Sequence, residues 1–283
     1  MSAPVPPSLP FRGPFGAERP SPLHALPLPP APMPSHHRSR PLKAWRYVGV
    51  FGAELMACAA LVRVGRARQC FWAVWDRRER RLYERTRLGT GAVSLAPGYV
   101  GVRDHGIEIE LQLSETAGIE AVCRSGESYA WTRKQGGIDA HGTVTVGGAR
   151  RELTARAVVD DTAGYYERHT SWWWSAGVGL SDDGRALAWN LVRGVNDPPC
   201  HSERTVWVDG VPVEAPPVDF ARDLTAVDGL RFTPEATRER RENMLLIRSS
   251  YRQPFGTYAG ELPGGLGKLA EGFGVMERHQ AWW

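Results

Sequence analysis

The amino-acid sequence predicts an all-β fold of antiparallel strands. From Trp45 onward, short segments rich in β-branched and aromatic residues alternate with Gly, Asp and Ser turns, which is typical of an antiparallel sheet. The segment Ile107–Leu113 alternates apolar and polar residues, so one face would meet a core and the other water. The 11 Trp, 31 Gly and 22 Pro among 283 residues exceed what a helical protein usually carries.

The N-terminal segment differs in composition from the rest. Residues 1–41 hold 13 of the 22 prolines, so neither a helix nor a sheet ladder can run through them. We therefore expect a proline-rich extended arm over residues 1–43. It is either a polyproline-like tail with little fixed structure, or its Phe and Leu side chains lie along the folded body. The adjacent His36 and His37 are expected to be solvated.

The first half of the chain predicts eight strands and then a hairpin. Val146–Ala149 is read as a tight turn that joins the last two strands. The expected strands are Trp45–Phe51, Met56–Val64, Phe71–Arg77, Arg81–Arg87, Tyr99–Arg103, Ile107–Leu113, Ile119–Val122, Tyr129–Lys134, His141–Val146 and Arg151–Val159.

The second half repeats this pattern, with a hairpin turn at Asp209-Gly210. One segment is ambiguous, because Thr233-Pro234-Glu235 resembles a capped helix start, while the charged run to Asn243 equally suits a solvated strand. The expected strands are Ser171–Gly177, Arg185–Val192, Arg204–Val208, Val211–Glu214, Leu230–Thr233, Met244–Tyr251, Thr257–Leu262 and Gly272–Trp282.

Charge and cysteine content narrow the class of protein. The net charge is +4, but Lys and Arg are mixed with acidic residues along the chain, which argues against nucleic acid as a partner. Four cysteines are scattered without a C-x-x-C pair, as in reduced cytoplasmic proteins. The apolar run near Val48–Val64 is too short to span a bilayer. We expect a cytoplasmic protein without a membrane span.

The segment Asp160–Leu180 concentrates the unusual chemistry, because it contains three consecutive tryptophans. Each indole covers roughly 150–250 Å², so all three exposed would form an exceptionally large apolar patch. On an extended strand Trp172 and Trp174 face one side and Trp173 the other. Both sides therefore need cover from a core, a neighbouring domain or a bound molecule.

Polar residues before the triplet are the candidate catalytic groups. Asp161–Gly164 fits a type I turn, which leaves Asp160 as the freer general acid or base. His169 can transfer protons near neutral pH, and Arg168 can hold a carboxylate or polarise a carbonyl. A buried, hydrogen-bonded structural pair of Arg168 and His169 is the alternative.

Further residues are candidates for ligand contact. Glu277 and His279 share one face of the last expected strand, where the alternative is a solvated face. Trp131, next to Arg133, and Asn190 are candidate ligand contacts. Glu203 and Arg204 suggest a surface ion pair.

Several motifs are missing from the sequence. It contains no P-loop, no dinucleotide-binding glycine motif, no H-E-x-x-H and no G-x-S-x-G. The histidines are too dispersed to argue a zinc site from sequence. We therefore expect no cofactor and no metal, which leaves cofactor-independent chemistry or plain binding.

Longer motifs carry a family resemblance. Through LPLPPAPMP, DDTAGYYERHTSWWWSAGVG, AWNLVRGVNDPPCHSERTVWVDG and YRQPFGTYAGELPGG the chain resembles the bacterial domain-of-unknown-function 2804 (DUF2804) family. More distantly it is similar to two-domain lipocalin-like proteins, which include carotenoid hydratases, AttH-type proteins and fungal pericyclases. In that distant group an Asp-His pair is frequent, whereas here Arg168 precedes His169.

The resemblance implies an all-β fold of two consecutive antiparallel lipocalin-like (calycin-type) barrels or a strongly bent double sheet. The expected domains are residues 44–158 and 159–283, with a small-molecule cavity in or between them. We hypothesise binding of a mostly apolar isoprenoid, lipid or polyketide-like molecule. The chemistry would be that of a hydratase, isomerase or cyclase. The alternative is a noncatalytic carrier or scaffold, and the sequence leaves open whether the protein is an enzyme.

Overall fold

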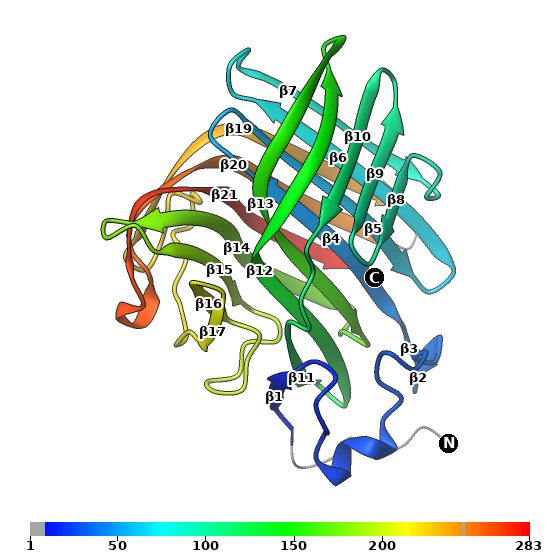
Figure 1. The fold of residues 1–283 in the computed structure, drawn as a ribbon. Helices are drawn as coiled ribbons and strands as arrows, with labels where there is room; N and C mark the ends of the chain where they lie inside the picture. Colours follow the sequence, from blue (N-terminus) through cyan, green and yellow to red (C-terminus); the bar gives the residue numbers. More distant parts are fainter. Residues whose placement is uncertain (1–8, 245–246) are drawn as a thin grey trace.

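The computed structural model describes residues 9–244 and 247–283. Most of these residues are in strands, which form two large antiparallel sheets packed face to face (Figure 1). Two short 3₁₀ helices, η1 (Ser21–Ala25) and η2 (Pro263–Gly265), and a small pair of strands, β2 (His36–His37) and β3 (Arg40–Pro41), complete the described fold. None of the described helices has the length and apolar character needed to cross a membrane.

The first sheet has eleven strands. They are β1 (Phe11–Pro14), β4 (Lys43–Phe51), β5 (Leu55–Val64), β6 (Ala67–Asp76), β7 (Arg81–Leu88), β8 (Val93–Ala96), β9 (Tyr99–Asp104), β10 (Ile107–Leu113), β11 (Ile119–Ser125), β12 (Ser128–Val146) and β13 (Ala149–Gly164). Their order is β7-β6-β5-β4-β13-β12-β10-β9-β8, and β11 pairs with both β12 and β1.

The second sheet has eight strands. They are β14 (His169–Ser181), β15 (Ala186–Arg193), β16 (Thr205–Val208), β17 (Val211–Glu214), β18 (Ala226–Val227), β19 (Leu230–Met244), β20 (Ile247–Glu261) and β21 (Lys268–Trp282). Their order is β17-β16-β15-β14-β21-β20-β19-β18. Within the described chain neither sheet closes through strand pairing, so the bent double sheet is found and not a pair of closed barrels.

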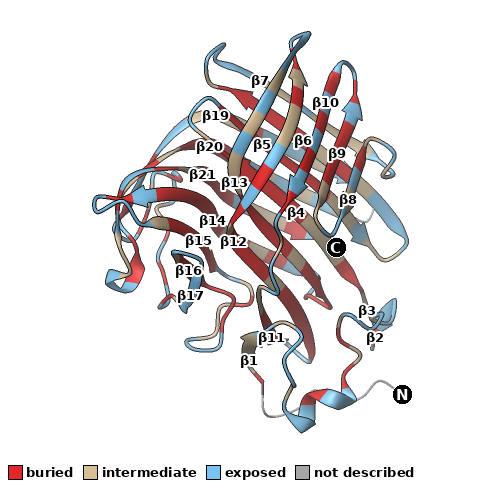
Figure 2. Ribbon diagram, in the orientation of Figure 1, coloured by how far each residue is buried: buried red, intermediate tan, exposed pale blue. Residues whose placement is uncertain are grey.

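The alternating patterns of the sequence correspond to the observed faces. In β10 the four apolar residues are buried and the three polar ones exposed, as predicted. Val146 pairs with Ala149 across a two-residue turn. Gly147 and Gly148 there have φ of 59° and 80°, which is the backbone that a tight hairpin requires. Figure 2 shows the buried residues running along the strands where the two sheets face each other.

The proline-rich arm lies along the body from residue 9 onward, which is the second of the two expected alternatives. Leu23, Leu26 and Leu28 are buried against the β11–β12 hairpin, and β1 pairs with β11. The Arg19 guanidinium donates two hydrogen bonds of 2.9 and 2.7 Å to Glu120. His37, expected to be solvated, is instead buried and bonded to Ser128 at 2.8 Å.

One local prediction is wrong, and one ambiguous segment is resolved as the strand alternative. Asp161–Gly164 is not a turn but the end of β13, because Arg46 and Arg133 on the two neighbouring strands pair directly with Asp161. The charged run after Thr233 is the strand β19, which pairs with β20 and has a bulge at Pro234/Ala236. The expected strand Met244–Tyr251 falls partly outside the described residues.

The two sheets belong to successive parts of the chain. Strand β13 continues past residue 158 to Gly164, and the second sheet begins at His169. The change of sheet therefore falls at residues 165–168. Between the sheets lies a core cluster that contains residues of β4, β5 and β6 from one side and of β14, β15 and β21 from the other.

Gly136 on β12 marks a close approach of the two sheets. A Cβ added there would lie 2.3 Å from Cε3 of Trp207 on β16, and Trp207 is buried. The ring has little freedom to move away, so any side chain at position 136 would push the sheets apart.

We predict that Gly136→Ala lowers the free energy of unfolding by about 1–3 kcal/mol, the usual cost of overpacking. Urea denaturation followed by tryptophan fluorescence measures the change. Gly91→Ala is the control, because a Cβ at position 91 meets nothing within 4 Å. Equal stability of the two variants would contradict the close contact between the sheets.

Candidate functional site

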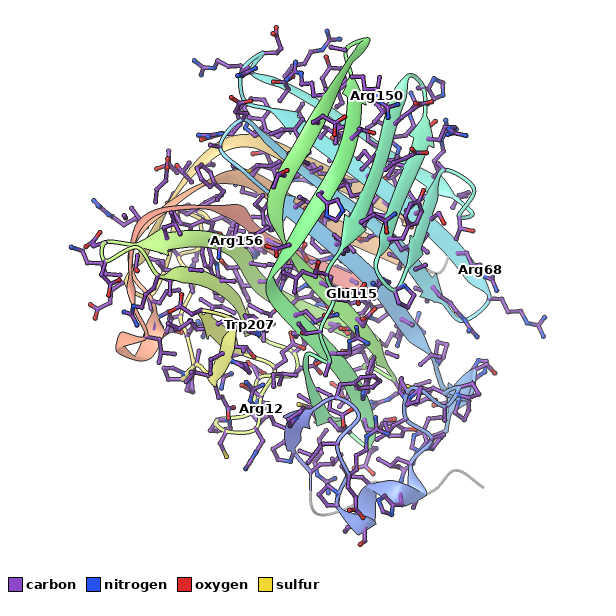
Figure 3. All side chains as sticks on the ribbon, viewed as in Figure 1. Arg12, Arg68, Glu115, Arg150, Arg156 and Trp207 are labelled. Atoms are coloured by element: carbon purple, nitrogen blue, oxygen red, sulfur yellow. The ribbon has the colours of Figure 1, made fainter. Side chains whose placement is uncertain are left out.

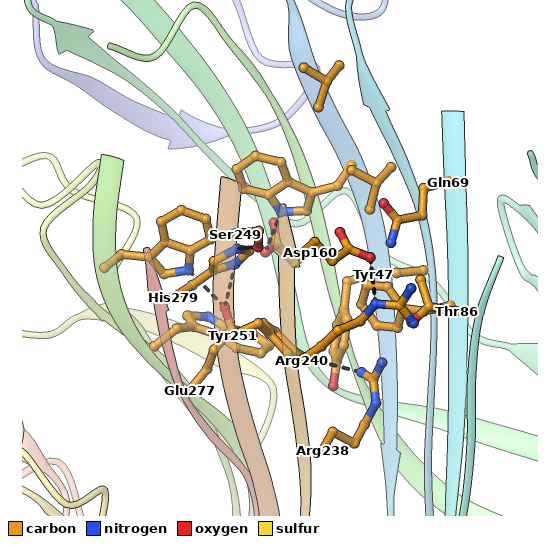
Figure 4. Close-up of a pocket in the computed structure, with 18 of the residues that line it drawn as sticks. Tyr47, Gln69, Thr86, Asp160, Arg238, Arg240, Ser249, Tyr251, Glu277 and His279 are labelled. Atoms are coloured by element: carbon orange, nitrogen blue, oxygen red, sulfur yellow. Dashed lines mark hydrogen bonds and ion pairs between the residues drawn. The ribbon is translucent and has the colours of Figure 1, made fainter. Parts of the chain in front are cut away.

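A cavity of about 440 Å³ lies between the two sheets (Figure 4). It is lined by β4 to β7, β12 and β13 of the first sheet, by β14, β15 and β19 to β21 of the second, and by the loop that follows β15. Its volume is in the range of ligand pockets, roughly 300–1,000 Å³. We call it the chamber.

Exposed lining residues mark the opening of the chamber. Arg68 projects outward at the end of the β5–β6 hairpin (Figure 3). Leu88, at the end of β7, is 75% exposed, and Glu239 and Arg240 of β19 line the same rim. The rim is therefore charged and contains one exposed apolar side chain.

Aromatic rings form the walls. Trp45 and Trp172 are parallel, with centroids 6.2 Å apart and an interplanar angle of 4°. Tyr166 stacks on Trp45 at 5.8 Å, and Trp174 meets Tyr47 edge to face at 5.2 Å. As predicted for an extended strand, Trp172 and Trp174 face one side, and Trp173 faces the other, where the Arg278 guanidinium covers it.

Each chamber-facing indole N–H has a polar partner. Trp172 Nε1 donates to Glu277 Oε1 at 2.9 Å, Trp174 Nε1 to Asn190 Oδ1 at 2.8 Å, and Trp45 Nε1 to Asp160 Oδ2 at 3.1 Å. These bonds fix the orientation of the rings and leave their faces as the apolar surface of the chamber.

Glu277 and His279 lie together on β21, as their spacing predicted. The second oxygen of Glu277 accepts a hydrogen bond from Gln253 at 2.8 Å. Burial raises the pKa of Glu277 to about 7, against the opposing effect of the bonds from Trp172 and Gln253. Burial also lowers the pKa of His279 to about 3, so its ring is neutral and hydrogen bonded to Ser249 at 2.7 Å.

A second polar group lies where β12 and β13 meet the loop after β15. The Lys134 ammonium contacts Asp160 Oδ1 and lies 3.3 Å from Glu203 Oε1. Burial alone would lower the pKa of Lys134, but the carboxylates of Asp160 and Glu203 raise it above its usual value. Lys134 therefore remains an ammonium at neutral pH.

Arg238 supplies a buried cation elsewhere in the chamber. Its Nε donates to Glu84 at 2.8 Å and its Nη1 to the Tyr251 hydroxyl at 3.1 Å. The guanidinium lies over the Phe71 ring at 4.3 Å. Figure 4 shows Gln69 and Thr86 on the opposite side of the chamber from Ser249 and His279.

Two polar atoms of chamber-lining residues lack a strong partner. The Tyr47 hydroxyl lies beside the Cys58 thiol, a weak hydrogen-bonding group, and makes no other hydrogen bond among the described residues. Asn196 donates to the Tyr166 hydroxyl at 2.8 Å and to Glu203 at 3.0 Å, but its own amide oxygen is buried without a partner in the described chain.

The structure brings Asp160, Trp172, Trp174, Glu277 and His279 to one chamber. Asn190 does not line the chamber itself, but its amide oxygen accepts the hydrogen bond from Trp174. The other three candidate residues lie elsewhere, and their places are described next.

His169 and Arg168 do not line the chamber. His169 is exposed, stacks on Trp282 at 4.5 Å and lines a separate hollow of about 430 Å³. Arg168 is exposed, and its carbonyl accepts the backbone N–H of Trp283. Trp131 packs under the N-terminal arm and donates to Glu120 at 2.8 Å.

Sequence reasoning missed several chamber residues. Glu203 and Arg204 are both buried and do not form the expected surface ion pair. Glu203 turns to Lys134, while Arg204 donates to the backbone carbonyls of Asp197 and Pro198. Adjacent opposite charges usually indicate a surface, and the sequence contains no signal that joins Glu203 to a lysine 69 residues earlier.

The described residues contain no group of three or more His, Cys, Asp or Glu side chains arranged to hold a metal ion. The chamber carboxylates are occupied instead by indole, amide, hydroxyl and ammonium donors. We therefore assign no metal ligands in the chamber.

Comparison with known proteins identifies a family match. The family model described as "Domain of unknown function (DUF2804)" matches residues 96–283. The search of curated proteins found no significant match.

Three solved structures show a distant likeness to this chain. An AttH-like protein from Nitrosomonas europaea is 13% identical, with a TM-score of 0.46 over 89% of this chain and 98% of that one. Kievitone hydratase from Nectria haematococca is 12% identical, with a TM-score of 0.43 over 83% and 88%. CghA bound to Sch210972 is 9% identical, with a TM-score of 0.38 over 96% and 97%. Their likeness to this chain concerns the fold.

The raised pKa of Glu277 predicts that the free energy of unfolding depends on pH. The folded protein binds the proton more tightly than the unfolded chain, so the carboxyl group destabilises the fold as pH rises from about 4.5 to 7. Relative to Glu277→Gln, the wild-type protein should lose up to about 3 kcal/mol of unfolding free energy over that range. Urea denaturation at a series of pH values measures the difference.

Glu235→Gln is the control, because the pKa of Glu235 is lowered: burial would raise it, but hydrogen bonds from Arg77 and Trp75 outweigh this. The wild type should gain stability relative to that variant as pH rises. His279 lowers the free energy of unfolding at acid pH. Because its pKa is lowered in the folded state, stability is lost as pH falls below about 6.5. A stability difference between wild type and Glu277→Gln that does not change with pH would contradict the assignment.

Proposed function

The chain belongs to the DUF2804 family, and from the geometry of its chamber we propose that it binds a mostly apolar small molecule there and exchanges protons with it. One observation carries the proposal. A cavity of about 440 Å³ walled by indoles contains a buried carboxyl group, Glu277, that titrates near neutral pH.

The walls favour an apolar ligand. The indole N–H groups of Trp45, Trp172 and Trp174 are already bonded to protein groups, so the ring surface that these residues turn to the chamber is carbon. At roughly 30 Å³ for each water molecule, the chamber would otherwise hold about fifteen. An isoprenoid, lipid or polyketide-like molecule that displaces this water gains the hydrophobic free energy.

The proposed place of action is the cytoplasm, where the four thiols stay reduced.

The proton-exchanging groups are Glu277 and Asp160. A general acid or base is most effective when its pKa lies near the working pH, and Glu277 meets that condition. Asp160 is close enough for its charge to raise the pKa of Glu277, in addition to the larger effect of burial. In the proposed chemistry one of the two carboxyl groups donates a proton and the other accepts one.

This pair suits hydration, isomerisation or cyclisation. A carboxylic acid protonates an alkene carbon, and the π electrons form the new C–H bond and leave a cation on the neighbouring carbon. The indole faces stabilise that cation. Loss of a proton to the other carboxylate gives an isomer; addition of water, followed by loss of its proton, gives a hydrate. Attack by a second alkene of the same molecule closes a ring and leaves a cation on the other carbon of that alkene, which loss of a proton to the other carboxylate neutralises.

The competing functions are a noncatalytic carrier and a scaffold in which the tryptophans only pack the sheets together. A carrier would share the chamber but need no titrating acid. A scaffold would need no chamber. The volume beside Trp172 and Trp174 supports a ligand over a scaffold, and the variants below separate an enzyme from a carrier.

Occupation of the chamber can be tested with N-phenyl-1-naphthylamine, a neutral apolar fluorophore. We expect its emission to rise on binding to the wild type. In Val62→Trp the apparent affinity for the fluorophore should be at least tenfold lower. Val62 lines the chamber near its rim. Arg63→Trp is the control, because Arg63 is exposed and points to the opposite face of β5. Equal binding by both variants would refute the site.

Catalysis can be tested on a molecule that the protein retains from its host. Native mass spectrometry of the purified protein identifies it, and incubation in D₂O should then place deuterium on carbon or convert the molecule to an isomer or hydrate. Glu277→Gln and Asp160→Asn should retain the molecule but lose deuterium incorporation by at least 100-fold, the lower end of general acid-base contributions. No incorporation by the wild type would leave a carrier, and full incorporation in both variants would exclude Glu277 and Asp160 as the proton-exchanging groups.

A further inference from the structure

Two carboxyl groups in the chamber share a single ammonium. Lys134 Nζ contacts Asp160 and lies 3.3 Å from Glu203. All three side chains are buried, with exposures of 1% for Lys134, 7% for Asp160 and 3% for Glu203. If both carboxyl groups were ionised, this triad would carry one net negative charge away from water, which is costly.

Neighbouring charges do not cancel that negative charge. The groups that face Glu203 are Lys134 on β12 and Asp160 on β13, together with Cys123, Tyr166 and Arg204. Arg204 is the only additional cation among them in the described chain, but its guanidinium is turned to backbone carbonyls. Arg204 also faces the carboxylates of Asp197 and Glu214, and Glu214 pairs in addition with Arg12. The two arginines and the two carboxylates balance, so no positive charge remains to neutralise the triad.

The hydrogen bonds distinguish the two carboxyl groups. Asp160 accepts from Lys134, from Thr162 Oγ1 at 2.8 Å and from Trp45 Nε1 at 3.1 Å. Glu203 lies farther from the Lys134 ammonium than Asp160 does, and it accepts one hydrogen bond, from Asn196. Donors favour the ionised form, so an added proton would reside mainly on Glu203. In agreement, burial raises the pKa of Glu203, although Lys134 opposes the rise.

We propose that Asp160, Lys134 and Glu203 hold one proton in common at neutral pH, and that this triad acts as a proton store that reaches the bound molecule through Asp160. The storage requires no ligand; the delivery step rests on the proposed function. Lys134 and Glu203 are thereby positioning and supply residues, and Asp160 is the group that touches the substrate.

The transfer balances without any further reactant. Glu203 gives its proton to Lys134 Nζ as the ammonium gives one of its own to Asp160, so Lys134 keeps its charge. Asp160 then donates this proton to the bound molecule and becomes a carboxylate. Glu277, as carboxylate, takes a proton from another atom of that molecule. A proton from solvent restores the triad, and Glu277 releases its proton to solvent before the next cycle.

The stored proton can be measured on the ligand-free protein by infrared difference spectroscopy, through the C=O stretch that only a protonated carboxyl group has. The Glu277→Gln variant is the starting protein, because burial raises the pKa of Glu277 to about 7 and its own protonated carboxyl group would add to the signal. At pH 7 it should show one protonated carboxyl per chain, shifted in D₂O.

Charge balance predicts the response of each further substitution. Asp160→Asn and Glu203→Gln each leave one carboxylate with one ammonium, so both should lose the signal, even though Glu203 is still present in the first. Lys134→Met leaves two carboxyl groups without a cation and should keep or increase it. Glu235→Gln, which changes an ion-paired carboxylate elsewhere, should have no effect.

A signal that survives in Asp160→Asn would mean that Glu203 is protonated by burial alone, and it would overturn the shared proton. Absence of the signal in the starting protein would do the same. If Lys134→Met does not fold, the two carboxyl variants still decide the question. Failure here leaves ligand binding in the chamber untouched, since the fluorophore and native mass spectrometry experiments measure that independently.

Discussion

The chamber depends on the pairing of indole N–H groups with buried polar partners. Trp172, Trp174 and Trp45 each donate to a buried polar residue, namely Glu277, Asn190 and Asp160. Loss of one partner would leave a buried donor unsatisfied, at a cost of about 1–3 kcal/mol. Because the rings are held at their polar edges, they line the space between the sheets without collapsing into it, and the same bonds place two carboxyl groups beside the apolar surface.

This arrangement lowers the stability of the fold. Glu277, His279 and the triad of Asp160, Lys134 and Glu203 lie where apolar side chains would pack more favourably. The cost is spread over donors that come from different strands. Glu277 is held by Trp172 of β14 and Gln253 of β20, and Arg238 of β19 is held by Glu84 of β7. The contact between Arg238 and Glu84 therefore also joins the two sheets.

Local features of the fold were predictable from sequence, and errors arose where distant residues intervene. The alternation in Ile107–Leu113 and the Gly147-Gly148 turn were predicted correctly, because each rests on the intrinsic geometry of a strand or hairpin. Asp161 was assigned to a turn, which its local sequence favours. Its strand position follows instead from Arg46, 115 residues away in the chain, which holds the carboxylate with two bonds of 2.8 Å.

The sequence by itself determined the all-β class, most strand positions, the two faces of the tryptophan triplet and the shared face of Glu277 and His279. These follow from the period-two alternation of side chains along a strand. Only the tertiary structure decided that Asp160 belongs with Lys134 and Glu203, that His169 lies outside the chamber, and that the wall includes Trp45 and Arg238. A cavity forms where strands distant in the chain face each other, and no local pattern records which residues will meet there.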